Sequence, residues 1–442
     1  MTYDLNPDTN KAICLYPFSH AASHPNNDRI LCCVQANEPV AKGGTLEEYW
    51  NNDKMREIRR DMLAGKKRPE CINCYNQEER IGSSVRFNIG SPSREHWWSR
   101  FSDTELATGH LNSLPTDFDY RTIHCNLSCT HCGPHYSTAW QKEIRDLQAT
   151  VLPDERLMLS PQQDYKLDPE QEAIFGDELI QAIDDRRLEY IYWAGGEPMM
   201  SPMHWRVMDH LQEAYKVDPT WVKTVRIRYN TNLTRSTWKG INVYEYLSNL
   251  NVELSPSLDG VGPVFNYVRN GGDWDKVAVN WESCMKHLKG TSVATVVTSL
   301  WIFDVDNYFD FFEPYNPLYM SQTLQTWDKG YPWPPSSSAA LDPALFPAEI
   351  MIPAIDHALE RINTLKDDNK HGFPPDWSKQ KFINILNAYK DEHERKHKDL
   401  TVHRSSIKDI IRQLERLRPD SNTMSNVLMK VNTEAWIWWN GI

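Results

Sequence analysis

"FDYRTIHCNLSCTHC", residues 118–132, combines a strand pattern with three closely spaced cysteines. Its first half, 118–125, contains aromatic and β-branched residues, which predicts a strand. The thiols of Cys125, Cys129 and Cys132 follow directly. Three thiolates in one loop can hold a metal ion or an iron–sulfur cluster. The stretch therefore predicts a metal-binding loop at the end of a strand.

Strand and helix patterns alternate along the chain after this loop. Further strands are predicted over 189–195, 224–232, 251–260 and 291–300, and helices over 136–149, 202–216, 242–249 and 275–288. This alternation is typical of a parallel α/β sheet or barrel, whose active sites lie at the carboxyl ends of the strands. The predicted strand ends carry Cys125, the run Gly195–Pro198, Asn232 and Asp259.

Composition limits the class of protein. The chain has 442 residues, 40% of them hydrophobic and 24% charged, which predicts a globular protein of two or three domains, or one large barrel with an appendage. The net charge of −12 disfavours a nucleic-acid-binding surface. We expect a cytoplasmic protein without a membrane partner, because no apolar stretch reaches roughly 18 residues and no signal-peptide pattern opens the chain. In that reducing compartment, nine cysteines indicate metal or redox chemistry.

The spacing of the three cysteines leaves two kinds of site open. A closed zinc site needs a fourth ligand, for which the nearby candidates are His124, His131 and His135. The asymmetric triplet also suits a cube-shaped cluster with one open corner. An iron without a protein thiolate can bind a substrate or cofactor directly.

The triplet, taken with "WAGGEPMM" at 193–200, resembles the signature of the radical S-adenosylmethionine (SAM) enzymes. The resemblance implies an α/β fold with a partial (β/α)6 barrel, and a [4Fe–4S] cluster held by Cys125, Cys129 and Cys132. SAM would bind the fourth iron, and its reductive cleavage would yield a radical that abstracts a substrate hydrogen. The implied SAM contacts in these two motifs are His131, Gly195, Gly196, Glu197 and Pro198.

Two later stretches resemble sequence motifs of the same family that are less specific. They are "YNTNLT" at 229–234 and "SPSLDGVGPVFNYVRNGG" at 255–272, and they imply SAM contacts for Asn232, Ser257 and Arg269. The alternative interpretation is that these three residues form turns or cap helices. Related peptide-modifying enzymes often carry a His-Asp pair where this chain has Phe265 and Asn266.

A second cysteine group lies before residue 80. Cys14, Cys32, Cys71 and Cys74 supply four thiolates, which can hold zinc or a fully ligated [4Fe–4S] cluster. The surrounding sequence, with a strand predicted over 29–34 and a helix or helix pair over 45–65, resembles the twitch (SPASM-like) auxiliary-cluster domain of radical SAM enzymes.

Cys32 and Cys33 are adjacent, and successive side chains of a strand point to opposite faces. Only one of them is therefore expected to face the auxiliary cluster. The spacing Asn27-x4-Cys32 resembles the family's Gly-x4-Cys pattern and favours Cys32. Cys33 and Cys284 are interpreted as small core residues.

The resemblance predicts three regions: a twitch domain over 1–95, a radical SAM barrel over 115–320 and a mostly helical extension over 321–442. It implies an oxidoreductase or modifying enzyme that acts on a peptide or on a sugar- or cyclitol-like small molecule. An auxiliary [4Fe–4S] cluster would transfer electrons, with flavodoxin or ferredoxin as reductant. No catalytic side chain is assigned. The alternatives are a non-enzymatic iron–sulfur or zinc scaffold or redox sensor, and an RNA-modifying radical SAM enzyme.

Overall fold

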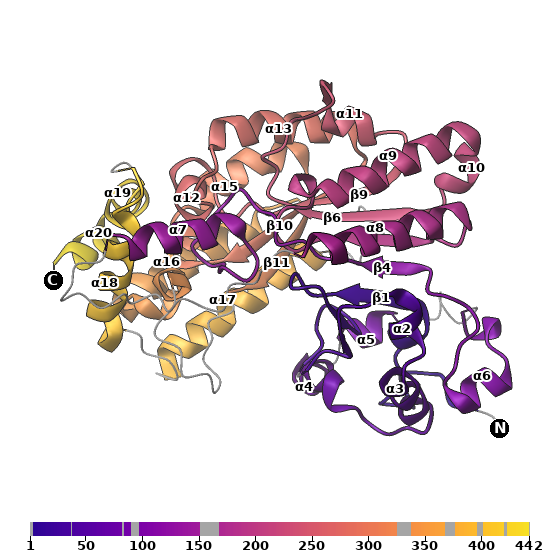
Figure 1. Ribbon diagram of the computed structural model, residues 1–442. Helices are drawn as coiled ribbons and strands as arrows, with labels where there is room; N and C mark the ends of the chain where they lie inside the picture. The colour runs from indigo at the N-terminus through magenta and orange to yellow at the C-terminus, as the bar shows by residue number, and fades with distance from the viewer. Residues whose placement is uncertain are drawn as a thin grey trace. The chain divides into compact units, whose positions relative to one another are not determined.

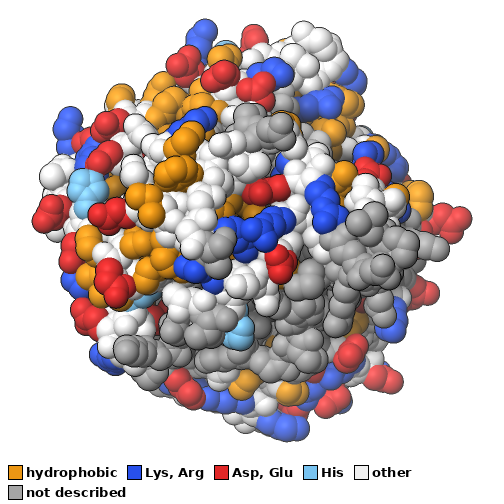
Figure 2. Space-filling view, turned by 90° about the vertical axis from the view of Figure 1, so that its left-hand side faces the viewer, with side chains coloured by type: hydrophobic (Ala, Val, Ile, Leu, Met, Phe, Trp, Pro, Cys, Tyr) orange, Lys and Arg blue, Asp and Glu red, His pale blue; other side chains and the backbone are white. Residues whose placement is uncertain are grey.

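The computed structural model describes residues 3–36, 38–81, 84–89, 97–150, 168–324, 337–366, 376–395, 401–419 and 422–441. They form a mixed α/β structure (Figure 1). The chain divides into two compact units, the first made of 1–123 with 165–228 and the second of 124–164 with 229–442. Acidic, basic and hydrophobic side chains lie intermixed on the face seen in Figure 2. Within the described ranges, no helix has the length and apolar character needed to cross a membrane.

The first unit is built on a mixed sheet. Its strands are β1 (His20–Ser23), β2 (Asp28–Ile30), β3 (Ala41–Lys42), β4 (Asp117–Asp119) and β5 (Tyr190–Trp193). They lie in the order β3-β2-β1-β4-β5, and β1, β4 and β5 run parallel while β2 and β3 are antiparallel to their neighbours. Phe118 of β4 pairs with Ala21 on one side and Ile191 on the other. The parallel part of the sheet therefore includes the N-terminal strand β1.

The helices of this unit are listed in chain order. They are α1 (Tyr16–Ser19), α2 (Leu46–Trp50), α3 (Asp53–Leu63), α4 (Ile72–Ile81), α5 (Val85–Ile89), α6 (Asp103–Thr108), α8 (Pro169–Asp184), α9 (Pro202–Val217) and α10 (Pro219–Val222), with the 3-10 turns η1 (Pro69–Cys71) and η3 (Pro198–Met200). Thr45 caps α2 in a capping box with Glu48, and Gly65 follows α3 at φ +75°. The helix pair predicted over 45–65 is confirmed.

The second unit continues the α/β pattern. Strand β6 (Arg226–Thr231) carries the chain out of the first unit and neighbours β9 (Asn251–Pro256), followed by β10 (Gly290–Val297) and β11 (Leu318–Thr323). The pairs β9/β10 and β10/β11 are parallel. A separate hairpin consists of β7 (Thr237–Trp238) and β8 (Ile241–Asn242).

The second unit contains most of the C-terminal helices. Its helices are α7 (Thr138–Gln148), α11 (Val243–Leu247), α12 (Gly262–Val268), α13 (Trp274–His287), α14 (Ser299–Phe303), α15 (Val305–Phe312), α16 (Ala348–Asn363), α17 (Trp377–Arg395), α18 (Arg404–Glu415), α19 (Met424–Val431) and α20 (Thr433–Asn440). An aromatic core joins α14 to α17, where Trp301 stacks on Phe382 at 5.1 Å between ring centres. The C-terminal helices thus share a core with the α/β part of this unit.

The strands and helices predicted between 189 and 288 are confirmed, with bounds that differ by a few residues. The strand predicted over 118–125 is wrong beyond Asp119, where β4 ends, and the strand predicted over 291–300 ends at Val297, before α14. Regular pairing of β4 ends at Asp119 and resumes only in a bridge between Thr122 and Gly195. The partial barrel and the three predicted regions stay predictions.

Another local prediction is wrong. The strand predicted over 29–34 ends at Ile30, and 31–34 form a bend and a turn. The Gln35 side chain accepts the Leu31 N–H at 2.6 Å, and the Gln35 N–H donates to the Cys32 carbonyl at 3.1 Å. These local hydrogen bonds replace the strand ladder. Cys32 and Cys33 are therefore not arranged by strand alternation.

Candidate functional site

In the first unit, the run Gly195–Pro198 follows β5 and lies against the backbone that follows β4. Gly195 has φ +108°, and a Cβ there would lie 2.4 Å from the Thr122 carbonyl oxygen and 2.8 Å from the Thr122 nitrogen. Gly196 N donates to the same carbonyl at 2.7 Å. Glycine is required at 195 because two backbones approach closely. The family resemblance explains Gly195 and Gly196 by SAM binding alone.

Glu197 and Pro198 complete this turn. Glu197 is fully buried, and its Oε1 accepts the Met199 N–H at 3.1 Å, so the side chain caps η3. Trp205 of α9 donates from Nε1 to the Met199 carbonyl at 2.7 Å. The sequence Gly-Gly-Glu-Pro therefore forms a fixed turn at the carboxyl end of β5.

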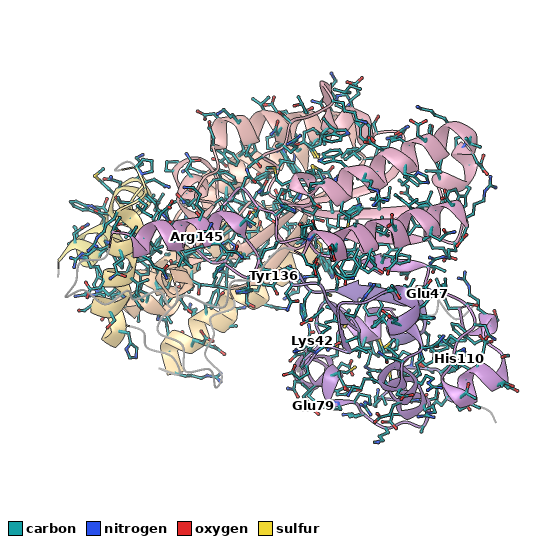
Figure 3. All side chains as sticks on the ribbon, viewed as in Figure 1. Lys42, Glu47, Glu79, His110, Tyr136 and Arg145 are labelled. Atoms are coloured by element: carbon teal, nitrogen blue, oxygen red, sulfur yellow. The ribbon has the colours of Figure 1, made fainter. Side chains whose placement is uncertain are left out.

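In the second unit, the cysteine loop is held from the start of α7, and Figure 3 labels Tyr136 before that helix and Arg145 within it. Cys125 N donates to the Thr138 hydroxyl at 3.2 Å, and that hydroxyl donates to the Cys125 carbonyl at 2.9 Å. Trp140 Nε1 donates to the Cys129 carbonyl at 2.8 Å, and Cys132 N to the same carbonyl at 2.9 Å. These hydrogen bonds fix the backbone of all three cysteines and do not involve their sulfur atoms.

The segment after α12 also binds the loop. Thr130 N donates to the Val268 carbonyl at 2.8 Å, and Ser128 N to the Asn270 carbonyl at 3.0 Å. Asn270 Nδ2 donates to the Ser128 hydroxyl at 2.7 Å. These bonds place Arg269 beside the loop, where its Nη1 lies 3.7 Å from Cys129 Sγ.

Arg269 and His131 converge on Asp259. Arg269 Nη2 lies 2.6 Å from Asp259 Oδ2 and His131 Nε2 lies 3.4 Å from it, while Asp259 Oδ1 accepts the Val296 N–H at 2.7 Å. Burial lowers the pKa of His131 to about 4, against the attraction of Asp259. His131 is therefore neutral at pH 7. Burial raises the pKa of the Cys129 thiol, and the Arg269 guanidinium opposes this rise.

Asn232 and Ser257 have different surroundings. Asn232 Nδ2 donates to Asn126 Oδ1 at 3.0 Å and lies 3.9 Å from Cys125 Sγ. Ser257 N donates to the Thr231 carbonyl at 2.8 Å, and Ser257 forms a bridge with Ala294. The second unit therefore brings Asn232, His131 and Arg269 to the cysteine loop. The run Gly195–Pro198 belongs to the first unit.

Sequence reasoning assigned no role to Asp259 and missed a buried C-terminal anchor of the loop. Arg418 donates from Nη1 to the Thr130 hydroxyl at 3.3 Å and from Nε to Glu143 Oε1 at 3.2 Å, with its side chain 1% exposed. Asn422 Nδ2 donates to the Asn266 carbonyl at 3.0 Å. The position of Asp259 at the carboxyl end of the strand predicted over 251–260 was a usable signal, whereas Arg418 lies in no recognisable motif.

The N-terminal cysteines influence one another electrostatically within the first unit. Burial raises the pKa of Cys14 to about 12, and Cys74 adds to the rise. Burial also raises the pKa of Cys32, with contributions from Cys33, Cys14 and Cys71. Burial raises the pKa of Cys33 to about 11; Asp119 and Cys74 add to the rise, and Arg121 opposes it.

The donor chemistry of both cysteine groups fits a cationic metal centre. Buried neighbouring thiols resist ionisation, whereas coordination to a metal deprotonates a thiol outright. Within the described ranges, no three His, Cys, Asp or Glu side chains are gathered to hold a single metal ion. In a cluster each thiolate binds a different iron, so a cluster does not require the thiols to converge on one point.

Comparison with known proteins gives only distant likenesses. No protein-family model and no curated protein matches the chain. Among solved structures, SuiB of Streptococcus suis bound to S-adenosylmethionine is 13% identical, with a TM-score of 0.36 over 70% of this chain and 63% of that one. Native anSMEcpe with bound AdoMet and a peptide is 14% identical, with a TM-score of 0.33 over 54% and 57%. TYW1 with a lysine–pyruvate adduct is 9% identical, with a TM-score of 0.30 over 55% and 71%.

The chain thus spans little more than half of anSMEcpe. At these identities and TM-scores, the likeness is too slight to transfer a ligand or a substrate to this chain.

Proposed function

We propose that the chain is a radical SAM enzyme whose SAM-binding [4Fe–4S] cluster is held by Cys125, Cys129 and Cys132. The observation that carries the proposal is the anchored loop, in which backbone bonds fix all three cysteines while Arg269 and Asn232 lie close to two of the sulfur atoms. When bound, the cluster and SAM supply reductive cleavage of a sulfur–carbon bond and abstraction of a substrate hydrogen.

The residues around the loop have separate roles in this proposal. Arg269 offsets the negative charge of the Cys129 thiolate, and Asp259 holds the guanidinium in place. His131 stays neutral and offers a ring beside the loop for the adenine. Asn232 supports the loop at Cys125 through Asn126.

Gly195–Pro198 offers backbone groups to the methionine amine of SAM. Its turn is fixed by the Gly196–Thr122 hydrogen bond and by the buried Glu197 cap, so these groups are oriented before SAM binds. Ser257 is proposed as a further SAM contact, since it follows β9 directly.

The auxiliary [4Fe–4S] cluster is assigned to Cys14, Cys32, Cys71 and Cys74. Electrostatic interactions among these thiols support grouping them, because the pKa values of Cys14, Cys32 and Cys71 each shift in response to another member. Cys33 also interacts with Cys32 and Cys74, so the preference for Cys32 rests on the spacing Asn27-x4-Cys32. Four thiolates leave no iron open for a substrate and permit outer-sphere electron transfer. We infer an oxidative modification of a peptide or of a sugar- or cyclitol-like molecule, with flavodoxin or ferredoxin as reductant.

The test is anaerobic reconstitution of the chain and of a Cys125→Ala/Cys129→Ala/Cys132→Ala variant. About eight irons are expected in the parent, as two four-iron clusters require, and about half in the variant. SAM cleavage under dithionite should be lost completely. Cys284→Ala is the matched control, because Cys284 is buried in α13 with Thr291 as its hydrogen-bonding neighbour. SAM cleavage by the triple variant would refute the proposal.

A further inference from the structure

A group of basic and aromatic side chains lies on one face of the first unit's strands. On β5, Tyr190 and Tyr192 are half-buried on this face, whereas Ile191 and Trp193 are buried on the other. The guanidinium groups of Arg121 and Arg228 lie 5.9 Å and 5.8 Å from the centre of the Tyr192 ring. Two cations therefore lie within about 6 Å of one phenol ring that keeps some exposure to solvent.

The charge of this group is only partly compensated. Buried Asp119 accepts from Arg121 Nε at 3.1 Å and from Nη2 at 3.2 Å. Within the part of the chain that the structure describes, Arg121 Nη1 has no hydrogen-bond partner and Arg228 has no ion-pair partner. Asp119 thus pairs with Arg121, while Arg228 beside Tyr192 and Arg226, 5.9 Å from the centre of the Tyr190 ring, add further positive charge. The group therefore has an excess of positive charge and N–H donors.

This group of basic and aromatic side chains lies beside the proposed SAM-binding run Gly195–Pro198. A Cβ on Gly195 would lie 3.2 Å from the Arg121 Cβ, so Arg121 is directly beside the start of the Gly195–Pro198 run. Ligands of parallel α/β proteins bind outside the carboxyl ends of the strands. Arg121 and Tyr192 both lie at such ends, after β4 and near the end of β5.

We propose that Arg121 and Arg228 bind an anionic group of the substrate, a carboxylate or a phosphate, next to Tyr192. The substrate role rests on the proposed function, and the inference deepens it by naming the chemical class. A guanidinium presents planar paired donors that match the oxygens of either anion. Asp119 orients Arg121 by occupying the edge formed by Nε and Nη2, so that Nη1 is left for the ligand.

Tyr192 and Tyr190 add donors to this site. Burial raises the pKa of Tyr192 to about 12, against the opposing effects of Arg121 and Arg228, and raises that of Tyr190 further, with Arg228 opposing the rise. Both phenols therefore keep their protons at neutral pH and can donate to an anion.

The test is equilibrium binding of inorganic phosphate and of succinate to the reconstituted protein. We expect saturable binding of at least one anion, weakened about tenfold by Arg228→Gln, because a charge-assisted hydrogen bond is lost. Lys223→Gln is the matched control. It removes one positive charge at an exposed position of the same unit, where the Lys223 Nζ lies 5.7 Å from the centre of the Tyr215 ring, away from Tyr190 and Tyr192.

The anion affinity of the control variant should differ from that of the parent by less than twofold. Binding of phosphate alone would assign a phosphorylated substrate, and binding of succinate alone a carboxylate. Binding of neither anion, or equal losses in Arg228→Gln and Lys223→Gln, would overturn the inference.

The methionine carboxylate of SAM is a competing source of the anion. The same titration is therefore repeated with saturating SAM, and anion affinity should not change. Displacement by SAM would overturn the substrate assignment. Because the binding assay involves no SAM cleavage, it can succeed when the cleavage test of the proposed function fails, and the reverse also holds.

Discussion

At Gly195 the backbones that follow two neighbouring strands come so close that a side chain has no room. Both the positive φ and the 2.4 Å approach to the Thr122 carbonyl exclude other residues. The requirement is thus structural as well as chemical, and it couples the proposed SAM-binding run to the end of β4.

Gly195→Ala should lower the free energy of unfolding by about 2 kcal/mol more than Gly240→Ala does. Gly240 has φ +77°, but a Cβ there would meet no atom within 4 Å, so its variant isolates the backbone penalty. Denaturant unfolding measures both variants. Equal losses would show that the contact with Thr122 is relaxed in solution.

The two adjacent cysteines provide a second test at this scale. Cys32→Ala should lose about half of the bound iron, because the spacing Asn27-x4-Cys32 favours Cys32 as the ligand. Its thiol also interacts electrostatically with Cys33, Cys14 and Cys71. Cys33→Ala should keep its iron, since Asp119 and Arg121 affect the Cys33 thiol more than Cys74 does. Iron analysis and absorbance spectra compare the variants. Identical iron contents would remove the preference for Cys32.

At the scale of elements, the cysteine loop depends on segments that are far away in the sequence. The loop is bonded to the start of α7, to the segment after α12 and to Arg418 beyond α18. Arg418 also pairs with Glu143 of α7 in a nearly solvent-free setting. The C-terminal helices therefore help to hold the proposed cluster loop in place.

Arg418→Met should destabilise the chain by about 3 kcal/mol, because it leaves Glu143 buried without its cation. We also expect less iron in the reconstituted protein and a changed cluster spectrum, since the loop loses its Thr130 anchor. Arg412→Met is the control, because its pair with Asp409 is exposed and worth about 0.5 kcal/mol. Full iron content together with an unchanged spectrum in Arg418→Met would restrict Arg418 to a structural role.

Sequence predicted several elements with long regular patterns, but it missed the 16-residue helix α8. The strand at 224–232 and the helix at 202–216 carry enough alternation or helical period to be recognised. Strand β1 has only four residues and no alternation of burial, so nothing in "HAAS" marks it. The turn at Cys32 depends on the Gln35 side chain, and the Arg418–Glu143 pair spans 275 positions. Such contacts are set by tertiary structure, which local patterns do not encode.

At the scale of the whole molecule, the two cysteine groups have separate tasks in the proposed function. Cys125, Cys129 and Cys132 belong to the second unit and Cys14, Cys32, Cys71 and Cys74 to the first. A cluster with an open iron is needed for SAM, whereas a fully ligated one only transfers electrons.

Cys71→Ala/Cys74→Ala should therefore halve the iron content and still allow slow SAM cleavage. Oxidised product should be lost once a substrate is known. Circular dichroism has to show an intact fold first, because a small region can depend on its cluster for folding. Full product yield in a folded double variant would show that these cysteines have only a structural role.

The proposed function depends above all on SAM binding to the open iron of the cluster held by Cys125, Cys129 and Cys132. Electron paramagnetic resonance of the dithionite-reduced protein, recorded with and without SAM, reports on that iron. We predict that SAM changes the spectrum of the parent and of Cys71→Ala/Cys74→Ala, and has no effect on the variant lacking the three loop thiols. An unchanged spectrum of the fully reconstituted parent on addition of saturating SAM would contradict the proposed function.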